Sequence, residues 1–250
     1  RWAGGDSQEQ ALERALAVMS VLIIPLAVSV HSVLAWAFAV TPRPGWHSTI
    51  YAPYFVVAAL FSGVALVVVA VAVLRRAFGL ERYLEDGHLV RLGYLLLVSG
   101  ATYLYFTFAE LLTEGYVADR HLLPVLEGLL TGPYAGPFWT FVLAGLVAPV
   151  LLVALPWTRT ASGVTAAACL AVGAMWLKRF LVVVPPLSYP VVGEGFSPYR
   201  PSWVEVSVTA GAAAAVAWLL LLVFRLVPVL PVWEMARAGP GRPGGHGQGS

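Results

Sequence analysis

Charge is scarce in this 250-residue chain, and cysteine is nearly absent. Charged residues make up 11% of the sequence and hydrophobic residues 59%, whereas roughly a quarter of an ordinary soluble domain is charged. So little charge cannot cover a water-exposed surface. The one cysteine, Cys169, excludes a disulfide framework, a thiolate zinc cluster and a covalently attached haem. We interpret it as a packing residue.

Long apolar runs occupy most of the chain. Each reaches the roughly 20 residues that a helix needs to cross a hydrocarbon core about 30 Å thick. The runs are apolar on nearly every side, whereas the strands of a membrane barrel alternate polar and apolar residues. The sequence therefore predicts an all-α, polytopic membrane protein of about six transmembrane helices, in which the middle four form a four-helix bundle. The predicted spans are Leu12–Val40, Tyr51–Leu74, Leu89–Leu112, Tyr134–Pro156, Ala161–Val184 and Trp203–Val229.

Basic residues are distributed unevenly between the two ends of these spans. Ten of the 15 fall on one side, namely Arg1, Arg14, Arg75, Arg76, Arg82, Arg91, Arg159, Arg225, Arg237 and Arg242. The positive-inside rule then predicts a multi-pass protein of the plasma membrane with both ends of this segment in the cytoplasm. Because topology explains the basic residues, the net charge of +2 does not indicate a nucleic-acid partner.

The two ends of the sequence suggest part of a longer protein. The chain begins at Arg1 instead of a methionine, and we expect residues 1–237 to be the C-terminal part of a larger transmembrane domain. Residues 238–250 are rich in Gly and Pro and have no periodic apolar positions. That composition predicts a disordered tail.

Polar residues inside the apolar runs are the strongest functional signal, because a charged group at the bilayer centre costs roughly 2.5 to 3.5 kcal/mol on insertion scales. Five of them, spaced by 4, 4, 3 and 4 residues, share one face of a helix. We call them the polar stripe: Ser99, Tyr103, Thr107, Glu110 and Glu114. Such a stripe suits either a file of water that carries protons or a helix–helix seam held by hydroxyls.

Three further side chains lie within the apolar runs. Lys178 and Arg179 are adjacent, so they point about 100° apart, and one of them can pair with Glu110 while the other reaches toward the headgroups. His31 can hydrogen-bond a quinone carbonyl, serve a proton relay or simply bond a neighbouring helix. The other four histidines lie in loops or at helix ends. We therefore expect no haem and no other metal.

The order of residues from Ser29 to Gly63 resembles one known family. The chain reads SVHSVLAWAFAVTPRPGWHSTIYAPYFVVAALFSG there, and later reads TYLYFTFAELL, GAMWLKRFLVVVPPL and SPYRPSWVEVSVTAG. These segments resemble the NrfD/PsrC family, the membrane subunits of polysulfide-reductase-like complexes, and are most similar to the ten-helix members of alternative complex III. By that resemblance the chain corresponds to the last six helices. It departs from the pattern at Ala37 and Lys178, where carboxylates are usual.

The resemblance implies a subunit that is not catalytic alone, in a bacterial quinone-linked respiratory complex. It implies electron exchange between menaquinone or ubiquinone and a ferredoxin-like iron–sulfur subunit on the outer face, with molybdopterin-type or cytochrome subunits as further candidate partners. It implies no cofactor bound by this chain. It also implies proton translocation by the bundle, and a quinone pocket built mainly by helices that precede these six.

The candidate site residues fall into two groups. For a quinone site or a proton pathway we predict His31, Ser99, Tyr103, Thr107, Glu110, Lys178 and Arg179. For docking of the iron–sulfur partner we predict the aromatic residues of the outer loops, Trp46, His47, Tyr54 and Tyr199. Two other functions remain open, a structural anchor for a peripheral redox enzyme and a small-molecule or ion transporter.

Overall fold

A computed structural model describes residues 6–46, 48–81, 84–190 and 196–226. Every regular element in these ranges is a helix, and six helices are long and apolar enough to cross a membrane. The predicted helical class and the six spans are thus confirmed. The predicted tail at 238–250 and the docking candidate His47 lie outside the described residues. The chain divides into two compact units, Arg1–Pro198 and Tyr199–Ser250, which we describe separately.

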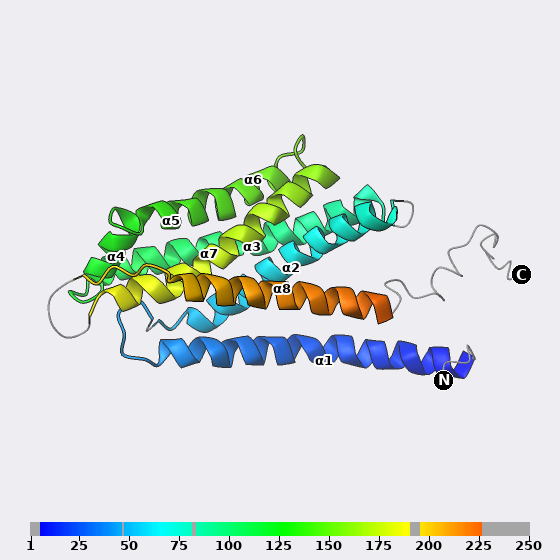
Figure 1. The fold of residues 1–250 in the computed structure, drawn as a ribbon, viewed down its shortest axis with the longest axis horizontal. Coiled ribbons are helices and arrows are strands. Elements are labelled where there is room, and N and C mark those ends of the chain that lie inside the picture. Colours follow the sequence, from blue (N-terminus) through cyan, green and yellow to red (C-terminus); the bar gives the residue numbers. More distant parts are fainter. Residues whose placement is uncertain (1–5, 47, 82–83, 191–195, 227–250) are drawn as a thin grey trace, which may run out of the picture. The chain divides into compact units, whose positions relative to one another are not determined.

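The first unit holds all helices except the last (Figure 1). Its elements are α1 (Asp6–Ala39), α2 (Tyr51–Phe78), α3 (Asp86–Val117), α4 (Leu123–Leu130), α5 (Ala135–Trp139), the π-helix η1 (Thr140–Val147), α6 (Ala148–Ala154) and α7 (Ala161–Ser188). The segments α5, η1 and α6 follow one another without a break and together make one span. The short helix α4, in the loop between two spans, was not predicted.

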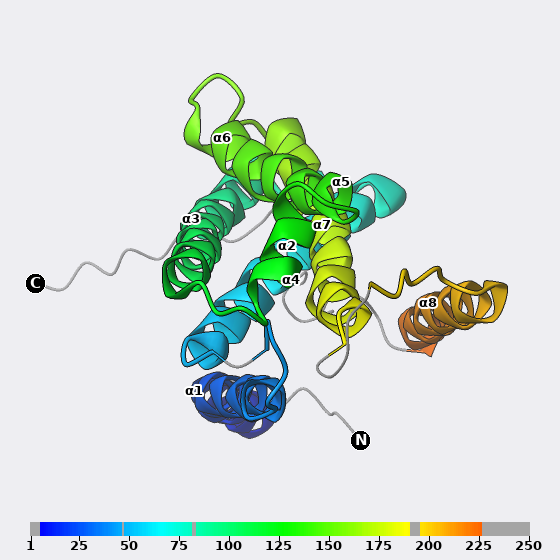
Figure 2. The same cartoon turned by 90° about the vertical axis from the view of Figure 1, so that its left-hand side faces the viewer.

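The predicted four-helix bundle is built from α2, α3, the α5–η1–α6 span and α7 (Figure 2). Its core is one cluster of buried side chains, which includes Phe61 from α2, Tyr103 from α3, Phe141 from η1 and Ala171 from α7. Cys169, which we interpreted as a packing residue, is exposed instead. Its side chain points away from the buried alanines of α7.

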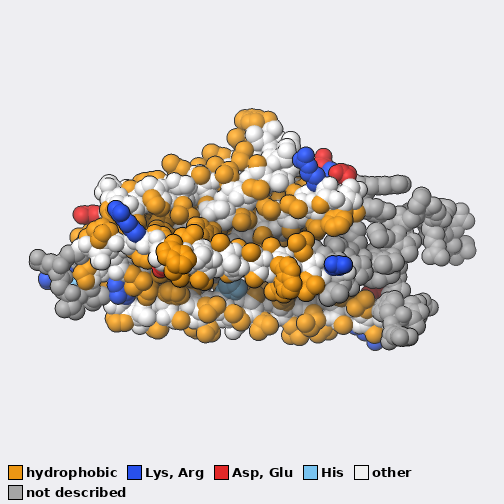
Figure 3. Space-filling view, viewed as in Figure 1, with side chains coloured by type: hydrophobic (Ala, Val, Ile, Leu, Met, Phe, Trp, Pro, Cys, Tyr) orange, Lys and Arg blue, Asp and Glu red, His pale blue; other side chains and the backbone are white. Residues whose placement is uncertain are grey.

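Helix α1 packs along α2, and its most apolar stretch of 18 residues contains no buried residue. Large apolar side chains therefore remain exposed along its length, as they do on the outer faces of the other spans. Figure 3 shows hydrophobic side chains over most of the visible face, with charged side chains toward the helix ends. Such a surface requires an apolar environment, as lipid or a neighbouring membrane protein provides.

The π-helix has a cause in the sequence. Pro149 has no backbone N–H to close the α-helical turn on Gly145, and just before it the helix widens, with Ala148 N–H bonding to Leu143 O five residues back. The widened segment packs closely on α7. A Cβ at Gly145 would lie 2.0 Å from the Cβ of Ala174, so only glycine fits there.

The C-terminal end of α7 is held by side chains from the loop after α1. Pro186 cannot donate to the carbonyl of Val182, four residues earlier, and the indole Nε1 of Trp46 donates to that carbonyl at 2.6 Å instead. Arg43 Nε donates to Pro186 O at 3.1 Å. Pro186 thus leaves one acceptor open, the Val182 carbonyl, and the end of α7 leaves another, the Pro186 carbonyl; both bind side chains of the α1–α2 loop.

The second unit contains α8 (Trp203–Leu226). A capping box starts this helix: Ser202 N–H donates to Glu205 Oε2 at 2.6 Å, and Glu205 N–H donates to Ser202 Oγ at 3.3 Å. Both bonds satisfy donors that the first turn of a helix leaves open.

Trp46→Phe tests the bond to α7. We expect it to lower the free energy of unfolding by about 1 to 3 kcal/mol, because the carbonyl of Val182 then has no donor. Pro186→Ala restores an N–H at the position that normally fills this carbonyl, so the cost of Trp46→Phe should shrink in that background. Thermal unfolding in detergent measures both. Trp157→Phe, at a tryptophan that is 75% exposed, is the control, and an equal cost in the two backgrounds would contradict the assignment.

Candidate functional site

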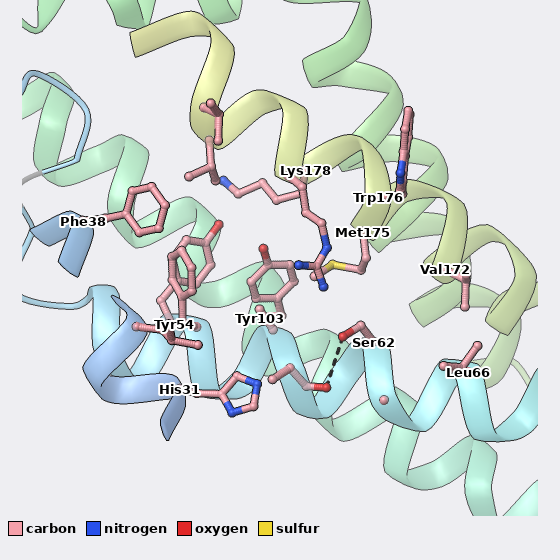
Figure 4. Close-up of a pocket in the computed structure, with 18 residues that line it drawn as sticks. His31, Phe38, Tyr54, Ser62, Leu66, Tyr103, Val172, Met175, Trp176 and Lys178 are labelled. Atoms are coloured by element: carbon pink, nitrogen blue, oxygen red, sulfur yellow. Dashed lines mark hydrogen bonds between the residues drawn. The ribbon is translucent and has the colours of Figure 1, made fainter. Parts of the chain in front are cut away.

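A cavity of about 650 Å³ lies between α1, α2 and α7, with Tyr103 of α3 at its inner wall (Figure 4). We call it the large cavity. Its lining is mostly apolar, and the polar side chains that reach it are His31 from α1, Ser62 from α2, and Lys178 and Arg179 from α7. Of the residues predicted for a quinone site or a proton pathway, four thus line one cavity: His31, Tyr103, Lys178 and Arg179. The apolar remainder of the lining is Leu34, Phe38, Phe55, Ala58, Ala59, Leu66, Val172, Met175, Trp176, Val182 and Val183, with Gly63 and Tyr54.

His31 has a defined orientation at the edge of the large cavity. Its Nδ1 lies 2.8 Å from the carbonyl oxygen of Ala27, one turn earlier on α1. A carbonyl only accepts, so Nδ1 carries the hydrogen, and Nε2 of the neutral ring is a hydrogen-bond acceptor. The plain alternative from sequence, a bond from His31 to a neighbouring helix, does not occur through Nδ1.

Lys178 forms an ion pair with Glu110 of α3. The sequence had left open whether Lys178 or Arg179 is the partner of Glu110. Lys178 Nζ lies 3.7 Å from Glu110 Oε2, and the two side chains are only 14% and 12% exposed. Nζ also lies 5.1 Å from the ring centre of Tyr54 and 5.4 Å from that of Phe141. The carboxylate and two aromatic faces together compensate the charge of an ammonium held away from bulk water.

A second, small cavity of about 40 Å³ is bordered by both members of this ion pair. Its polar lining consists of Tyr51, Thr107, Glu110, Glu114 and Lys178. One water molecule needs about 10 to 15 Å³ of such space and two or more polar partners. The small cavity therefore has the size and the chemistry to hold water beside two carboxyl groups, one helical turn apart on α3.

The polar stripe of α3 divides between these environments. Ser99 is buried, lines neither cavity and donates to Leu95 O of its own helix at 2.7 Å. Thr107 Oγ1 donates to Tyr103 O at 2.9 Å and lies 3.0 Å from the hydroxyl of Tyr54. Because the one hydroxyl proton of Thr107 is engaged, Tyr54 is the donor. The stripe thus borders open space only from Tyr103 onward.

Arg179 lines the large cavity without a carboxylate partner: within the described ranges no acidic side chain lies within 4.0 Å of it. Its guanidinium presents a planar fork of N–H donors to the cavity. Residues that sequence reasoning missed also contribute, since Ser62 and Tyr51 each border one cavity. A hydroxyl on an otherwise apolar helix, as at Ser62, is the signal that identifies them.

The described residues predicted for partner docking lie in three different environments. Tyr54 is 2% exposed, so we assign it to the core and the large cavity instead of a docking surface. Trp46 is engaged by α7 through its indole. Tyr199, in the second unit, is 40% exposed and donates to Glu205 at 2.9 Å. That hydrogen bond raises the pKa of Tyr199 above its usual range. Docking stays a prediction, and Tyr199 is its best-placed described residue.

Residues 8–190 match the family described as "Polysulphide reductase, NrfD". The matched region contains α2 to α7 and nearly all of α1, and hence both cavities and the ion pair.

Two curated relatives are similar to this chain. The chain is 27% identical to a putative membrane subunit of a dimethyl sulfoxide reductase of Halobacterium salinarum, over 91% of this chain and 57% of that protein. It is 28% identical to an Hdr-like menaquinol oxidoreductase integral membrane subunit of Archaeoglobus fulgidus, over 73% of this chain and 47% of that protein. The chain thus spans about half the length of these relatives.

Glu110→Gln tests the ion pair. It leaves the Lys178 ammonium without its counter-ion, and we expect a loss of roughly 3 to 5 kcal/mol in unfolding free energy. Glu110→Gln combined with Lys178→Met removes both charges and should recover most of that loss. Thermal unfolding of the purified protein in nanodiscs reports both values. Glu127→Gln, at an exposed carboxylate, is the control, and a double variant no more stable than Glu110→Gln would contradict the pairing.

Proposed function

The chain belongs to the NrfD polysulphide reductase family, and from this membership and its large cavity we propose that it is a membrane subunit of a quinone-linked oxidoreductase complex. The quinone headgroup binds in the large cavity. The observation that carries this proposal is the convergence of His31, Lys178 and Arg179 on one apolar cavity inside the membrane-spanning region.

The dimensions and lining of the large cavity suit such a ligand. Its volume of about 650 Å³ falls within the range of roughly 300 to 1,000 Å³ that is usual for small-molecule sites. Such sites are mainly apolar, with a few polar groups that fix the orientation of the ligand. A quinone has this character, because an apolar ring and tail carry two oxygens that need hydrogen-bond partners.

Two side chains have distinct tasks toward a quinol. His31 accepts a hydrogen bond from a quinol hydroxyl through Nε2, since its Nδ1 is committed to Ala27. Arg179, which keeps its charge, stabilises the negative charge that develops on a quinol oxygen as the proton leaves. Together they favour the deprotonated form, from which electrons are lost most easily.

Electron transfer, the other half of the reaction, is carried out by a partner subunit of the complex. We propose menaquinol as the donor or product, in line with the name of the Archaeoglobus relative, and a ferredoxin-like iron–sulfur subunit on the outer face as the electron carrier. Protons released on oxidation enter the small cavity at Glu110 and Glu114. In this proposal the iron–sulfur partner accepts the electrons.

His31→Leu tests the quinone site. We expect about a tenfold weaker affinity for dimethylnaphthoquinone, a soluble menaquinone analogue, because one hydrogen bond of about 1.4 kcal/mol is lost. Ser20→Ala, more than two turns away on the same helix and outside the cavity lining, should bind like the parent. Equilibrium binding to the purified complex measures both.

Two results of this binding experiment would contradict the proposal. If the complex binds the analogue but His31→Leu leaves the affinity unchanged, the headgroup lies elsewhere. If the parent complex does not bind the analogue at all, the quinone-linked function is wrong.

A further inference from the structure

Lys178 borders both cavities. Among the residues that line the large cavity, two also line the small one, Lys178 and Val182. Only the lysine carries a group that binds or releases a proton. Its amino group therefore lies at the boundary between the space proposed for the quinol and the space beside Glu110 and Glu114.

A second possible route for protons across this boundary runs through hydroxyl groups, but it does not reach Glu110. Tyr54 lines the large cavity and donates to Thr107, which lines the small one. The Thr107 hydroxyl in turn donates to the backbone carbonyl of Tyr103. A carbonyl in a helix cannot pass a proton on to Glu110, so these hydroxyls form a closed set of bonds. Lys178 is the remaining polar connection in the described part of the boundary.

We propose that Lys178 carries protons from a quinol in the large cavity to Glu110, and through it to Glu114. This inference rests on the proposed function, since the quinol is the proton source. It assigns to the lysine a task that is separate from the structural ion pair, although the same two groups take part.

The transfer balances in three steps. The Lys178 ammonium first gives a proton to the Glu110 carboxylate, so that an N–H bond breaks, an O–H bond forms and both groups become neutral. The neutral amine then takes one hydroxyl proton of the quinol, so that an O–H bond breaks and an N–H bond forms as one electron passes to the iron–sulfur partner, and a second cycle removes the second proton and the second electron. Glu110 releases its proton toward Glu114 through the small cavity, and the starting ion pair is restored.

The geometry permits this motion. The Nζ to Oε2 distance of 3.7 Å exceeds the roughly 2.6 to 3.2 Å of direct proton transfer, so one water or a small rotation of the side chain closes the gap. The four-carbon stem of lysine is flexible. The rings of Tyr54 and Phe141 stabilise the ammonium but donate no proton to its nitrogen. The amino group can therefore turn between the two cavities.

Lys178→Arg separates charge from proton transfer. The guanidinium keeps the ion pair with Glu110 and hence the fold, but it does not deprotonate in proteins. We expect the rate at which reduced dimethylnaphthoquinone reduces the iron–sulfur centres of the complex to fall about 100-fold or more, the contribution of a positioned acid–base group. Stopped-flow absorbance measures this single turnover. Thr113→Ala, at an exposed position of the same helix that borders neither cavity, should keep the parent rate.

Chemical rescue provides the second arm. In a Cys169→Ser background, Lys178→Cys is modified either with an aminoethyl thiosulfonate, which restores a titratable amine, or with its trimethylammonium analogue, which restores only charge. The proposal predicts recovery of the rate with the first reagent and not with the second, after mass spectrometry shows complete modification.

The outcomes separate the two proposals. A parent rate in Lys178→Arg, rescue by both reagents, or rescue by neither overturns the role of Lys178, provided that the parent complex oxidises the quinol analogue. A parent complex that does not react with the analogue overturns the proposed function, and the proton route with it.

Discussion

An ion pair held inside a membrane-spanning bundle constrains the residues around it. Lys178 and Glu110 are almost entirely removed from the surface, and either charge alone would be costly there. The faces of Tyr54 and Phe141, and the small cavity beside Glu114, compensate these charges. The pair thus explains why the aromatic core, the hydroxyl bonds and the two cavities meet at one level of the bundle.

Helix α7 brings Lys178 to this position, and irregular backbone on both sides supports it. The π-helical turn before Pro149 and the absence of a side chain at Gly145 let the neighbouring span approach Ala174, one turn before the lysine. At the far end, Trp46 supplies the donor that Pro186 lacks. Irregular backbone inside a membrane is tolerated where protein groups satisfy it, and both irregularities here have such partners.

Sequence reasoning predicted the six spans because span length and apolar composition are local properties, and it predicted the shared face of the polar stripe because helical spacing fixes it. It did not predict which cation pairs with Glu110, since Lys178 and Arg179 differ by only about 100° and tertiary packing decides. The Trp46 bond was missed for the same reason. The helix α4 and the π-helix were missed as well, although the π-helix has a local cause in Pro149. Tyr54 looked like a loop aromatic because it lies four residues after a turn, yet α2 turns it inward.

The site itself combines residues that are far apart in the chain. His31 and Lys178 both border the large cavity, and the central claim is that a quinone headgroup lies between them. Photolabelling of the complex with an azido-naphthoquinone, followed by peptide mapping, tests it most directly. Labels should fall on the α1 peptide around His31 and the α7 peptide around Lys178, and excess dimethylnaphthoquinone should suppress them. Suppressible labels found only on other helices or other subunits would contradict the claim.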